Sequence, residues 1–166
     1  MKKLHIELMK SKEEKYLASI PKVSLTQLEQ NIIVGSILGD GNLTYAPRSR
    51  NAYYREHFSI KQKEYREWKM NNIHSMKFRI EKECHLKSPS HPVFTELYDK
   101  FYINGIKTIT EDNIKLLNHP IGLACLYMDD GTLMISASKS KGAIRIHPTI
   151  GISTLSFSKE GCEILS

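Results

Sequence analysis

The sequence has few cysteines and no long apolar run. Its three cysteines, Cys84, Cys125 and Cys162, are odd in number and widely spaced along 166 residues. This pattern predicts reduced thiols rather than a disulfide framework. No stretch is long and apolar enough to cross a membrane, and the start, with Lys2 and Lys3, does not resemble a secretory signal. We therefore expect an intracellular protein of the cytoplasm, nucleoid or organelle matrix, with no membrane partner.

The composition is that of an ordinary globular protein with a basic balance. Hydrophobic residues make up 40% and charged residues 25%, so the chain can build one modest core. The formal net charge is +6 and the pI is near 9.2. This balance favours a polyanionic partner such as a nucleic acid.

Two similar stretches, residues 33–41 (IVGSILGDG) and residues 123–131 (LACLYMDDG), dominate the sequence. Each reads as an apolar helix whose last turn delivers a carboxylate before a glycine, at Asp40 and at Asp130. Glycine ends helices because it enters left-handed conformations at little cost. One such stretch is equally typical of a core helix with an Asp-Gly turn, but two copies indicate an internal repeat.

Local signals define where both helices begin. Ser24 and Gln27 read as a capping box before the first helix. Pro120 fits the first turn of the second helix, with Asn118 or His119 as its cap. We expect Gly35 and Gly39 to face Ala124 and Cys125, which would let the two helices pack closely in parallel. Two carboxylates would then meet at one end and could hold a metal ion.

These two stretches resemble the LAGLIDADG motif of homing endonucleases, in the branch with two motifs in one chain. The segment from Ser90 to Tyr98 is also similar to that branch, and the resemblance runs from about Ser24 to the C-terminus. It implies an α/β (α+β) pseudo-dimer, a monomer with an internal pseudo-twofold axis, in which two motif helices pack under an antiparallel β saddle. It also implies a Mg²⁺ site at Asp40 and Asp130, to which Gly39 and Asp129 are neighbours.

The resemblance assigns further roles within this site. Asp129 could share the metal, although it falls on a packing position of the motif. Lys107 precedes the second helix and matches, by its context, a lysine that reaches the catalytic pocket. Hard carboxylate oxygens suit Mg²⁺, which can polarise a phosphodiester and activate water. The implied reaction is a double-strand break within a long DNA site.

After the first motif we predict a β-ribbon for DNA. Residues 42–46 form a short strand, 47–51 a polar turn, and 53–63 an alternating strand with Tyr54, Phe58 and Ile60 on its apolar face. A ribbon with a basic face can enter a major groove, whereas the same pattern also fits a solvated sheet face. The predicted DNA-binding residues of this half are Arg48, Arg50, Arg55, His57, Ser59, Lys61 and Lys63.

The second half repeats the pattern. We expect a helix over 120–130 and strands over 132–139 and 143–154, with isoleucines from Ile144 to Ile152 on the apolar side. Lys139, Arg145 and His147 are its predicted DNA-binding residues. Pro148 indicates a bulge or an edge position, and Ser158 could cap a following helix.

Two departures from the family pattern are expected. We predict helices over 64–82 and 91–101, and the eight residues 83–90 leave no room for a second β-hairpin between them. The second half also stops early, which gives a basic leader (1–23), a first repeat (24–117) and an incomplete second repeat (118–166). Such a chain should bind DNA weakly and leave an apolar sheet face uncovered, which favours association.

Alternatives to the endonuclease remain. The fold could serve as an RNA maturase acting on intron RNA, or as a non-cutting DNA-binding protein, although two clustered aspartates favour cleavage. The start at Met1-Lys2 and the lack of a terminal His-Asn pair argue against an intein. Cys84, His85 and His91 suggest a zinc site, but they lack a second close pair of ligands.

Overall fold

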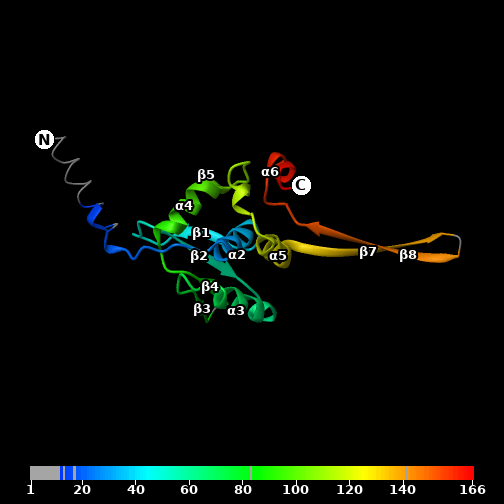
Figure 1. The fold of residues 1–166 in the computed structure, drawn as a ribbon, viewed down its shortest axis with the longest axis horizontal. Helices are drawn as coiled ribbons and strands as arrows, with labels where there is room; N and C mark the ends of the chain where they lie inside the picture. The colour runs from blue at the N-terminus through cyan, green and yellow to red at the C-terminus, as the bar shows by residue number, and fades with distance from the viewer. Residues whose placement is uncertain (1–11, 13, 17, 83, 141) are drawn as a thin grey trace.

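The computed structural model describes residues 12, 14–16, 18–82, 84–140 and 142–166. Two motif helices lie side by side at the centre, and a long two-stranded hairpin extends away from them (Figure 1). The elements in chain order are α2 (Gln27–Leu38), β1 (Asn42–Tyr45), β2 (Ala52–His57), a 3-10 turn (Ile60–Gln62), α3 (Lys63–Asn71), β3 (Arg79–Glu81), β4 (His85–Lys87), α4 (Pro92–Phe101), β5 (Tyr102–Ile103), β6 (Ile106–Lys107), a second 3-10 turn (Ile114–Leu116), α5 (Pro120–Asp130), β7 (Gly131–Ser140), β8 (Ala143–Ile152) and α6 (Lys159–Leu165).

Helix α2 begins at a capping box formed by Thr26 and Glu29, so the predicted pair of Ser24 and Gln27 was wrong by two residues. Glu29 N donates to Thr26 Oγ1, and the Glu29 carboxylate accepts from Thr26 N at 2.8 Å. The same buried carboxylate also accepts from the backbone N–H groups of His74 and Ser75. These donors come from residues that are distant in the sequence. They explain why Thr26 and Glu29, rather than Ser24 and Gln27, form the capping box.

Helices α2 and α5 pack in parallel with their backbones in contact. A Cβ atom on Gly35 would lie 2.0 Å from the Gly122 carbonyl oxygen, so only glycine fits there. One turn earlier, Asn31 accepts from the backbone N–H groups of Asn118 and His119, each at 2.9 Å. The close packing is confirmed, although Gly35 faces Gly122 rather than Ala124 or Cys125. The parallel register brings the C-terminal ends of both helices together.

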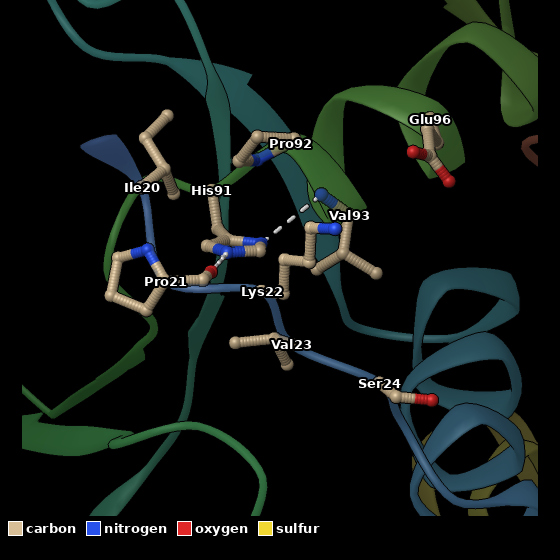
Figure 2. Close-up of a pocket in the computed structure, with 9 residues that line it drawn as sticks. All are labelled: Ile20, Pro21, Lys22, Val23, Ser24, His91, Pro92, Val93 and Glu96. Atoms are coloured by element: carbon tan, nitrogen blue, oxygen red, sulfur yellow. Dashed lines mark hydrogen bonds between the residues drawn. The ribbon is translucent and has the colours of Figure 1, made fainter. Parts of the chain in front are cut away.

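The ends of α5 and α4 follow the sequence closely. His119 caps α5 by accepting from Ile121 N, and Pro120 occupies the first turn as predicted. His91 caps α4 in the same way, through Val93 N. The other ring nitrogen of His91 lies 2.9 Å from the Pro21 carbonyl oxygen, which ties residues 20–24 to α4 around a pocket of about 470 Å³ (Figure 2). Of the residues considered for a site, only His91, from the zinc alternative, lines this pocket.

The first half contains a second hairpin that the sequence reading excluded. β3 and β4 are three residues each and extend the sheet in the order β1-β2-β4-β3. α3 therefore ends at Asn71, not at residue 82. The turn between the strands is tight because Cys84 takes a φ of 54°, a conformation that residue type alone does not reveal. The prediction of one long helix was wrong.

Strand β2 is also shorter than predicted. Its alternation places Tyr54 and Phe58 in the core and Arg55 and His57 on the exposed face, as expected, whereas Ile60 is 69% exposed. Beyond His57 the chain leaves the sheet, so three of the predicted DNA-binding residues do not extend this strand face. These three are Ser59, which caps the 3-10 turn, Lys61 within that turn, and Lys63, which begins α3.

The hairpin of β7 and β8 has one apolar and one polar face. Cross-strand pairs Ile135–Pro148 and Ala137–Ile146 lie on the apolar face. Lys139 pairs with Ile144 and so belongs to this apolar face, which corrects its predicted place beside Arg145 and His147. The large apolar side chains of this face are exposed, namely Leu133, Ile135, Ile144, Ile146 and Ile150.

The order α5–β7–β8–α6 repeats the order α2–β1–β2–α3. In the part of the chain that the structure describes, nothing after α6 corresponds to β3, β4 and α4, which cover and extend the first sheet. α2 is accordingly buried along most of its length, whereas Leu123 and Met128 of α5 are exposed. None of the described helices is both long and apolar enough to cross a membrane, and all three cysteines are free thiols.

We expect Glu29→Gln to remove a pH-dependent part of the stability. Burial tends to raise the pKa of Glu29, but hydrogen bonds from Ser75 and Thr26 outweigh it and lower the pKa from 4.5 to about 2. The stabilisation is therefore present above pH 4.5 and is lost as the pH falls toward 2. Urea unfolding midpoints between pH 6 and pH 2.5 should fall more steeply for the wild type than for Glu29→Gln. Glu96→Gln, at an exposed site of α4, should retain the wild-type pH profile.

We also expect the apolar face of the β7–β8 hairpin to drive self-association. The variant Ile135→Thr/Ile146→Thr should shift sedimentation velocity profiles toward the monomer at high concentration, with an unchanged unfolding midpoint, because both side chains are 67% exposed. Met134→Thr, on the opposite face, is the control. Equal association of all three proteins would show that this face takes no part in it.

Candidate active site

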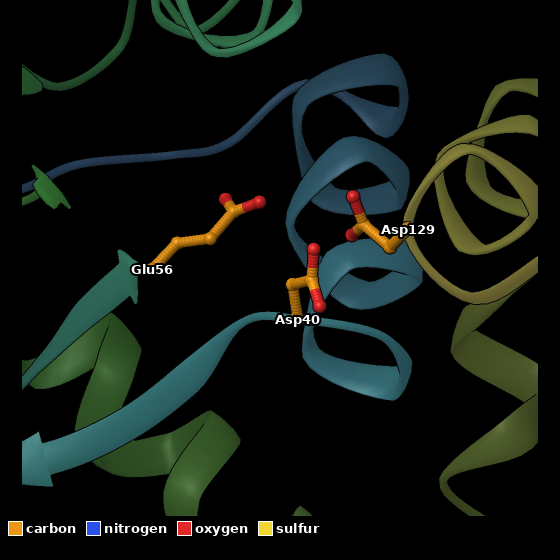
Figure 3. Close-up of side chains that lie close together, drawn as sticks. All are labelled: Asp40, Glu56 and Asp129. Atoms are coloured by element: carbon orange, nitrogen blue, oxygen red, sulfur yellow. The ribbon is translucent and has the colours of Figure 1, made fainter. Parts of the chain in front are cut away.

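The C-terminal ends of the motif helices bring three acidic side chains together. Asp40 follows the α2 cap Gly39, Asp129 lies in the last turn of α5, and Glu56 reaches in from β2. One carboxylate oxygen from each of the three lies within 4.8 Å of the others (Figure 3). A Cβ atom on Gly39 would lie 2.5 Å from Asp129 Cβ, so glycine at this position allows the close approach.

Two buried cations from α3 form ion pairs with the three acids of this cluster. Arg66 reaches Asp40 Oδ2 at 2.6 Å through Nη2, Asp129 Oδ1 at 3.1 Å through Nη1, and Glu56 Oε1 at 2.5 Å through Nε. Lys69 Nζ lies 2.8 Å from Glu56 Oε1 and 3.0 Å from Asp129 Oδ2. Both cations are almost fully buried, at 0% and 1% exposure. Such charges remain inside a protein only when they are paired.

The remaining partners complete the cluster. Tyr54 donates its hydroxyl proton to Glu56 Oε2 at 2.6 Å. The face of the Tyr65 ring lies under the guanidinium of Arg66 and the ammonium of Lys69. Burial raises the pKa of Asp129 to about 7, against the opposing effect of Lys69 and Arg66. Burial lowers the pKa of Arg66, but the carboxylates of Glu56, Asp129 and Asp40 outweigh it and raise that pKa overall.

Asp130 stands apart from this ion-paired cluster. Its carboxylate makes no ion pair with any described residue, and its pKa is raised by burial and by the charge of Asp40, while Lys107 opposes this. Asp40 and Asp130 are thus close enough to repel each other. A cation between them would relieve the repulsion.

Lys107 lies at the same end of the motif helices. Its Nζ donates to the carbonyl oxygens of Gly39 at 3.1 Å and Gly41 at 2.9 Å. Burial lowers its pKa, against the charges of Asp130, Asp40 and Asp129. The structure therefore brings Lys107 next to both motif acids, as the sequence context indicated.

Asp40 and Asp130 both offer hard carboxylate oxygens, the ligand type that Mg²⁺ prefers, although the acidic group with metal-binding geometry among the described residues is Asp40, Glu56 and Asp129. One oxygen of Asp40 is held by Arg66, which leaves Oδ1 available, and Asp130 is free of ion pairs with described residues. Both oxygens of Asp129, by contrast, are engaged by Lys69 and Arg66. In this structure Asp129 pairs with the buried cations, and a share of Asp129 in a metal site stays a prediction, since its carboxylate belongs to the acidic group with Asp40 and Glu56. The Gly39 carbonyl, also predicted at the metal, accepts from Lys107.

A basic row crosses the exposed face of the first sheet. Arg55 of β2 pairs across the strands with Lys87 of β4, which pairs with Arg79 of β3. Glu81 bridges Arg79 and Lys87. The sequence reading missed Arg79 and Lys87 because it placed residue 79 in a helix and residue 87 in a loop. Polar and apolar residues alternate over 79–81 and 85–87, but each stretch is only three residues long, so this signal is weak.

The other predicted DNA-binding residues are exposed around this face and on the hairpin. Arg48 and Arg50 lie in the turn between β1 and β2, where Arg50 stacks over Tyr16. Arg145 and His147 lie on the polar face of the β7–β8 hairpin, where His147 Nε2 is 2.8 Å from Ser138 Oγ.

The zinc alternative finds no support in the described residues. Both ring nitrogens of His91 are engaged, by Val93 N and by the Pro21 carbonyl, and the ring of His85 packs against His57. Cys84, His85 and His91 do not form a group with metal-binding geometry among the residues that the structure describes.

Comparisons with known proteins agree with this arrangement. The model of the LAGLIDADG DNA endonuclease family matches residues 30–166. Protein RecA of Mycobacterium shimoidei is 33% identical over 128 residues, which cover 74% of this chain and 30% of that protein. Protein RecA of Mycobacterium leprae is 30% identical over 122 residues, covering 69% of this chain and 17% of that protein. The chain thus spans less than a third of these relatives.

A solved structure shares the fold. The homing endonuclease I-WcaI bound to its DNA recognition sequence superposes with a TM-score of 0.64 and 19% sequence identity. The match covers 92% of this chain and 69% of that one.

We expect the neighbouring residues Asp129 and Asp130 to differ sharply in their effect on stability. Asp129→Ala leaves buried Lys69 and Arg66 short of a partner and should cost about 3–5 kcal/mol. That is a fall in melting temperature of about 6–20 °C for a chain of this size. Asp130→Ala removes a carboxylate that repels Asp40 and should leave the melting temperature unchanged or higher. Calorimetry of both variants in EDTA tests this, and equal losses would contradict the assignment.

Proposed function

The chain belongs to the LAGLIDADG DNA endonuclease family, and from this premise we propose that it hydrolyses phosphodiester bonds of double-stranded DNA at a specific site with Mg²⁺ held by Asp40 and Asp130. The observation that carries the proposal is that both motif acids lie at the C-terminal ends of two helices in contact, where the charge of Asp40 raises the pKa of Asp130. Lys107 lies at the same end of the two helices and is not part of the buried ion-pair cluster that Arg66 and Lys69 form.

The chemistry requires charge compensation at the phosphate. Mg²⁺, when bound, polarises the phosphoryl group and supplies water that is easily deprotonated. Asp40 and Asp130 hold it with hard oxygen ligands at the junction of the two halves. Lys107 is fixed by the Gly39 and Gly41 carbonyls next to both acids, where its ammonium can stabilise charge on the phosphate or help activate water. These groups come from different segments, so the site depends on helix packing.

The surface supports a DNA partner. The row of Arg55, Lys87 and Arg79 crosses the exposed sheet face, and the polar face of the β7–β8 hairpin carries Arg145 and His147. A basic two-stranded ribbon can enter a major groove, with arginines reading base edges or neutralising phosphates. I-WcaI, which shares the fold, is a homing endonuclease seen on its DNA recognition sequence, and this supports the same class of partner here.

The similarity to RecA concerns a segment of those proteins. Because the match covers 17% to 31% of each RecA chain but 69% to 78% of this chain, and the family model matches residues 30–166 here, we infer that these RecA chains carry a LAGLIDADG segment. The recombinase activity of RecA is not transferred to this chain. The observation also favours a context in which this unit lies inside a longer host protein.

We expect Asp40→Asn and Asp130→Asn each to abolish cleavage while leaving DNA binding intact or tighter, because each removes a metal ligand and a charge that repels phosphate. The assay incubates a library of random DNA duplexes with the protein and Mg²⁺ and sequences the new ends. Recurrent ends should appear with the wild type and disappear in EDTA. Lys107→Met should lower the cleavage rate by at least about tenfold.

The matched control is Asp112→Asn, whose exposed carboxylate pairs only with Lys115 among the described residues. It should cut like the wild type. Cleavage at the wild-type rate by either motif variant would refute the site, and binding without any recurrent cut would favour a non-cutting DNA-binding protein. Preferential binding of intron RNA over duplex DNA would favour a maturase.

A further inference from the structure

The two halves of the site differ in the surroundings of their motif acids. Asp40 and Asp130 occupy the same motif position, but the residue before each differs, Gly39 in one half and Asp129 in the other. α3 and α6 follow their hairpins in the same order, and in Figure 1 they lie on opposite sides of the α2–α5 pair. The repeat therefore allows a position-by-position comparison of the two helices.

The two buried cations of α3, Arg66 and Lys69, have no cationic counterparts on α6. Lys63-Glu64 begins α3 and Lys159-Glu160 begins α6. Counting from these shared starts, Arg66 corresponds to Cys162 and Lys69 to Leu165. The first half thus places a guanidinium against its motif acid, whereas the second half presents a thiol and an apolar side chain at the same positions.

Among the described residues, Arg66 is the cation of the buried cluster that also forms an ion pair with a motif acid. Its Nη2 lies 2.6 Å from Asp40 Oδ2, while its other nitrogens are held by Asp129 and Glu56, which are themselves buried. The guanidinium is planar and rigid, so three fixed carboxylate contacts leave the Asp40 side chain little rotational freedom. Lys69 shares Glu56 and Asp129 with Arg66, but it does not contact Asp40.

We propose that Arg66 is a positioning residue, which holds the Asp40 carboxylate with one of its oxygens engaged. The two halves of the cation site then differ, because Asp130 has no such partner among the described residues. The inference rests on the proposed cation site at the two motif acids. Arg66 holds one oxygen of the Asp40 carboxylate and competes with the cation for its charge. Asp130 makes no ion pair with any described residue, and Lys107 is the cation whose charge acts on it.

The test measures binding of Ca²⁺ alone by titration calorimetry, on the full chain without DNA. Arg66→Gln removes the competing cation and should tighten Ca²⁺ binding by roughly tenfold, since a unit charge a few ångströms from a divalent ion repels it strongly. This gain should vanish in the Asp40→Asn background and persist in the Asp130→Asn background. Thermal unfolding of Arg66→Gln should also become more dependent on Ca²⁺ than that of the wild type.

The control is Lys69→Gln, which removes an equally buried charge from the same helix without touching Asp40. Its effect on Ca²⁺ affinity should be smaller than about threefold. Equal effects of Arg66→Gln and Lys69→Gln, a weaker or unchanged affinity in Arg66→Gln, or a gain that survives Asp40→Asn would overturn the proposal. If Arg66→Gln does not fold, Arg66→Lys serves instead, because it keeps the charge but cannot reach all three carboxylates. The same Asp40-dependent gain, of several fold, is then expected.

The failure of this inference can be told from the failure of the proposed function. Ca²⁺ binding that is absent in the wild type, or unaffected by both Asp40→Asn and Asp130→Asn, would remove the cation site itself. Binding that depends on both acids but not on Arg66 would leave the site in place and remove only the role of Arg66.

Discussion

The contact between the Gly35 and Gly122 backbones fixes the distance between the two halves. Because no side chain separates α2 from α5 at that point, their C-terminal turns have to converge, and three carboxylates meet there. Asn31 sets the register from the other end through the backbone of residues 118 and 119. The positions of the acids, of the cations that pair with them and of Lys107 all depend on this one close approach between the helices.

Bringing acidic side chains together in the protein interior costs free energy, and the inner and outer acids of this site are compensated by cations to different extents. The innermost carboxylates, Glu56 and Asp129, share two buried cations and a tyrosine hydroxyl. The outer acids face the surface at which a phosphate could arrive. Charge is therefore sorted by depth: the inner acids are paired within the chain by two cations, whereas Asp40 shares only Arg66 and Asp130 has no ion-pair partner among the described residues. Arg66 is the side chain that spans both layers.

The sequence predicted the elements whose signals are local. The two motif helices, the proline starts, the α4 helix and both strands of the long hairpin came from periodicity and capping residues. The β3–β4 hairpin was missed because three-residue strands carry too little alternation and the turn depends on an unusual conformation of Cys84. Lys139 was misplaced because the polar residue type suggested the polar face, whereas pairing with Ile144 fixes the other.

The buried cluster was missed for a different reason. Glu56, Arg66 and Lys69 were not among the predicted site residues, since charged residues are seldom fully buried. Their burial arises only when α3, β2 and α5 come together, and no local pattern encodes that. Asp129 was correctly read as a packing position, but its ion pairs could not be read from the motif.

The cluster also limits how such a protein can be recombined. Its cations come from the first half and one of its carboxylates, Asp129, from the second, so the two halves are complementary parts rather than independent modules. A chimera that joins this first half to a second half with a small neutral residue before its motif acid would bury two cations with one acid fewer. This single position therefore constrains the exchange of halves between relatives, because Asp129 has to be kept together with Arg66 and Lys69.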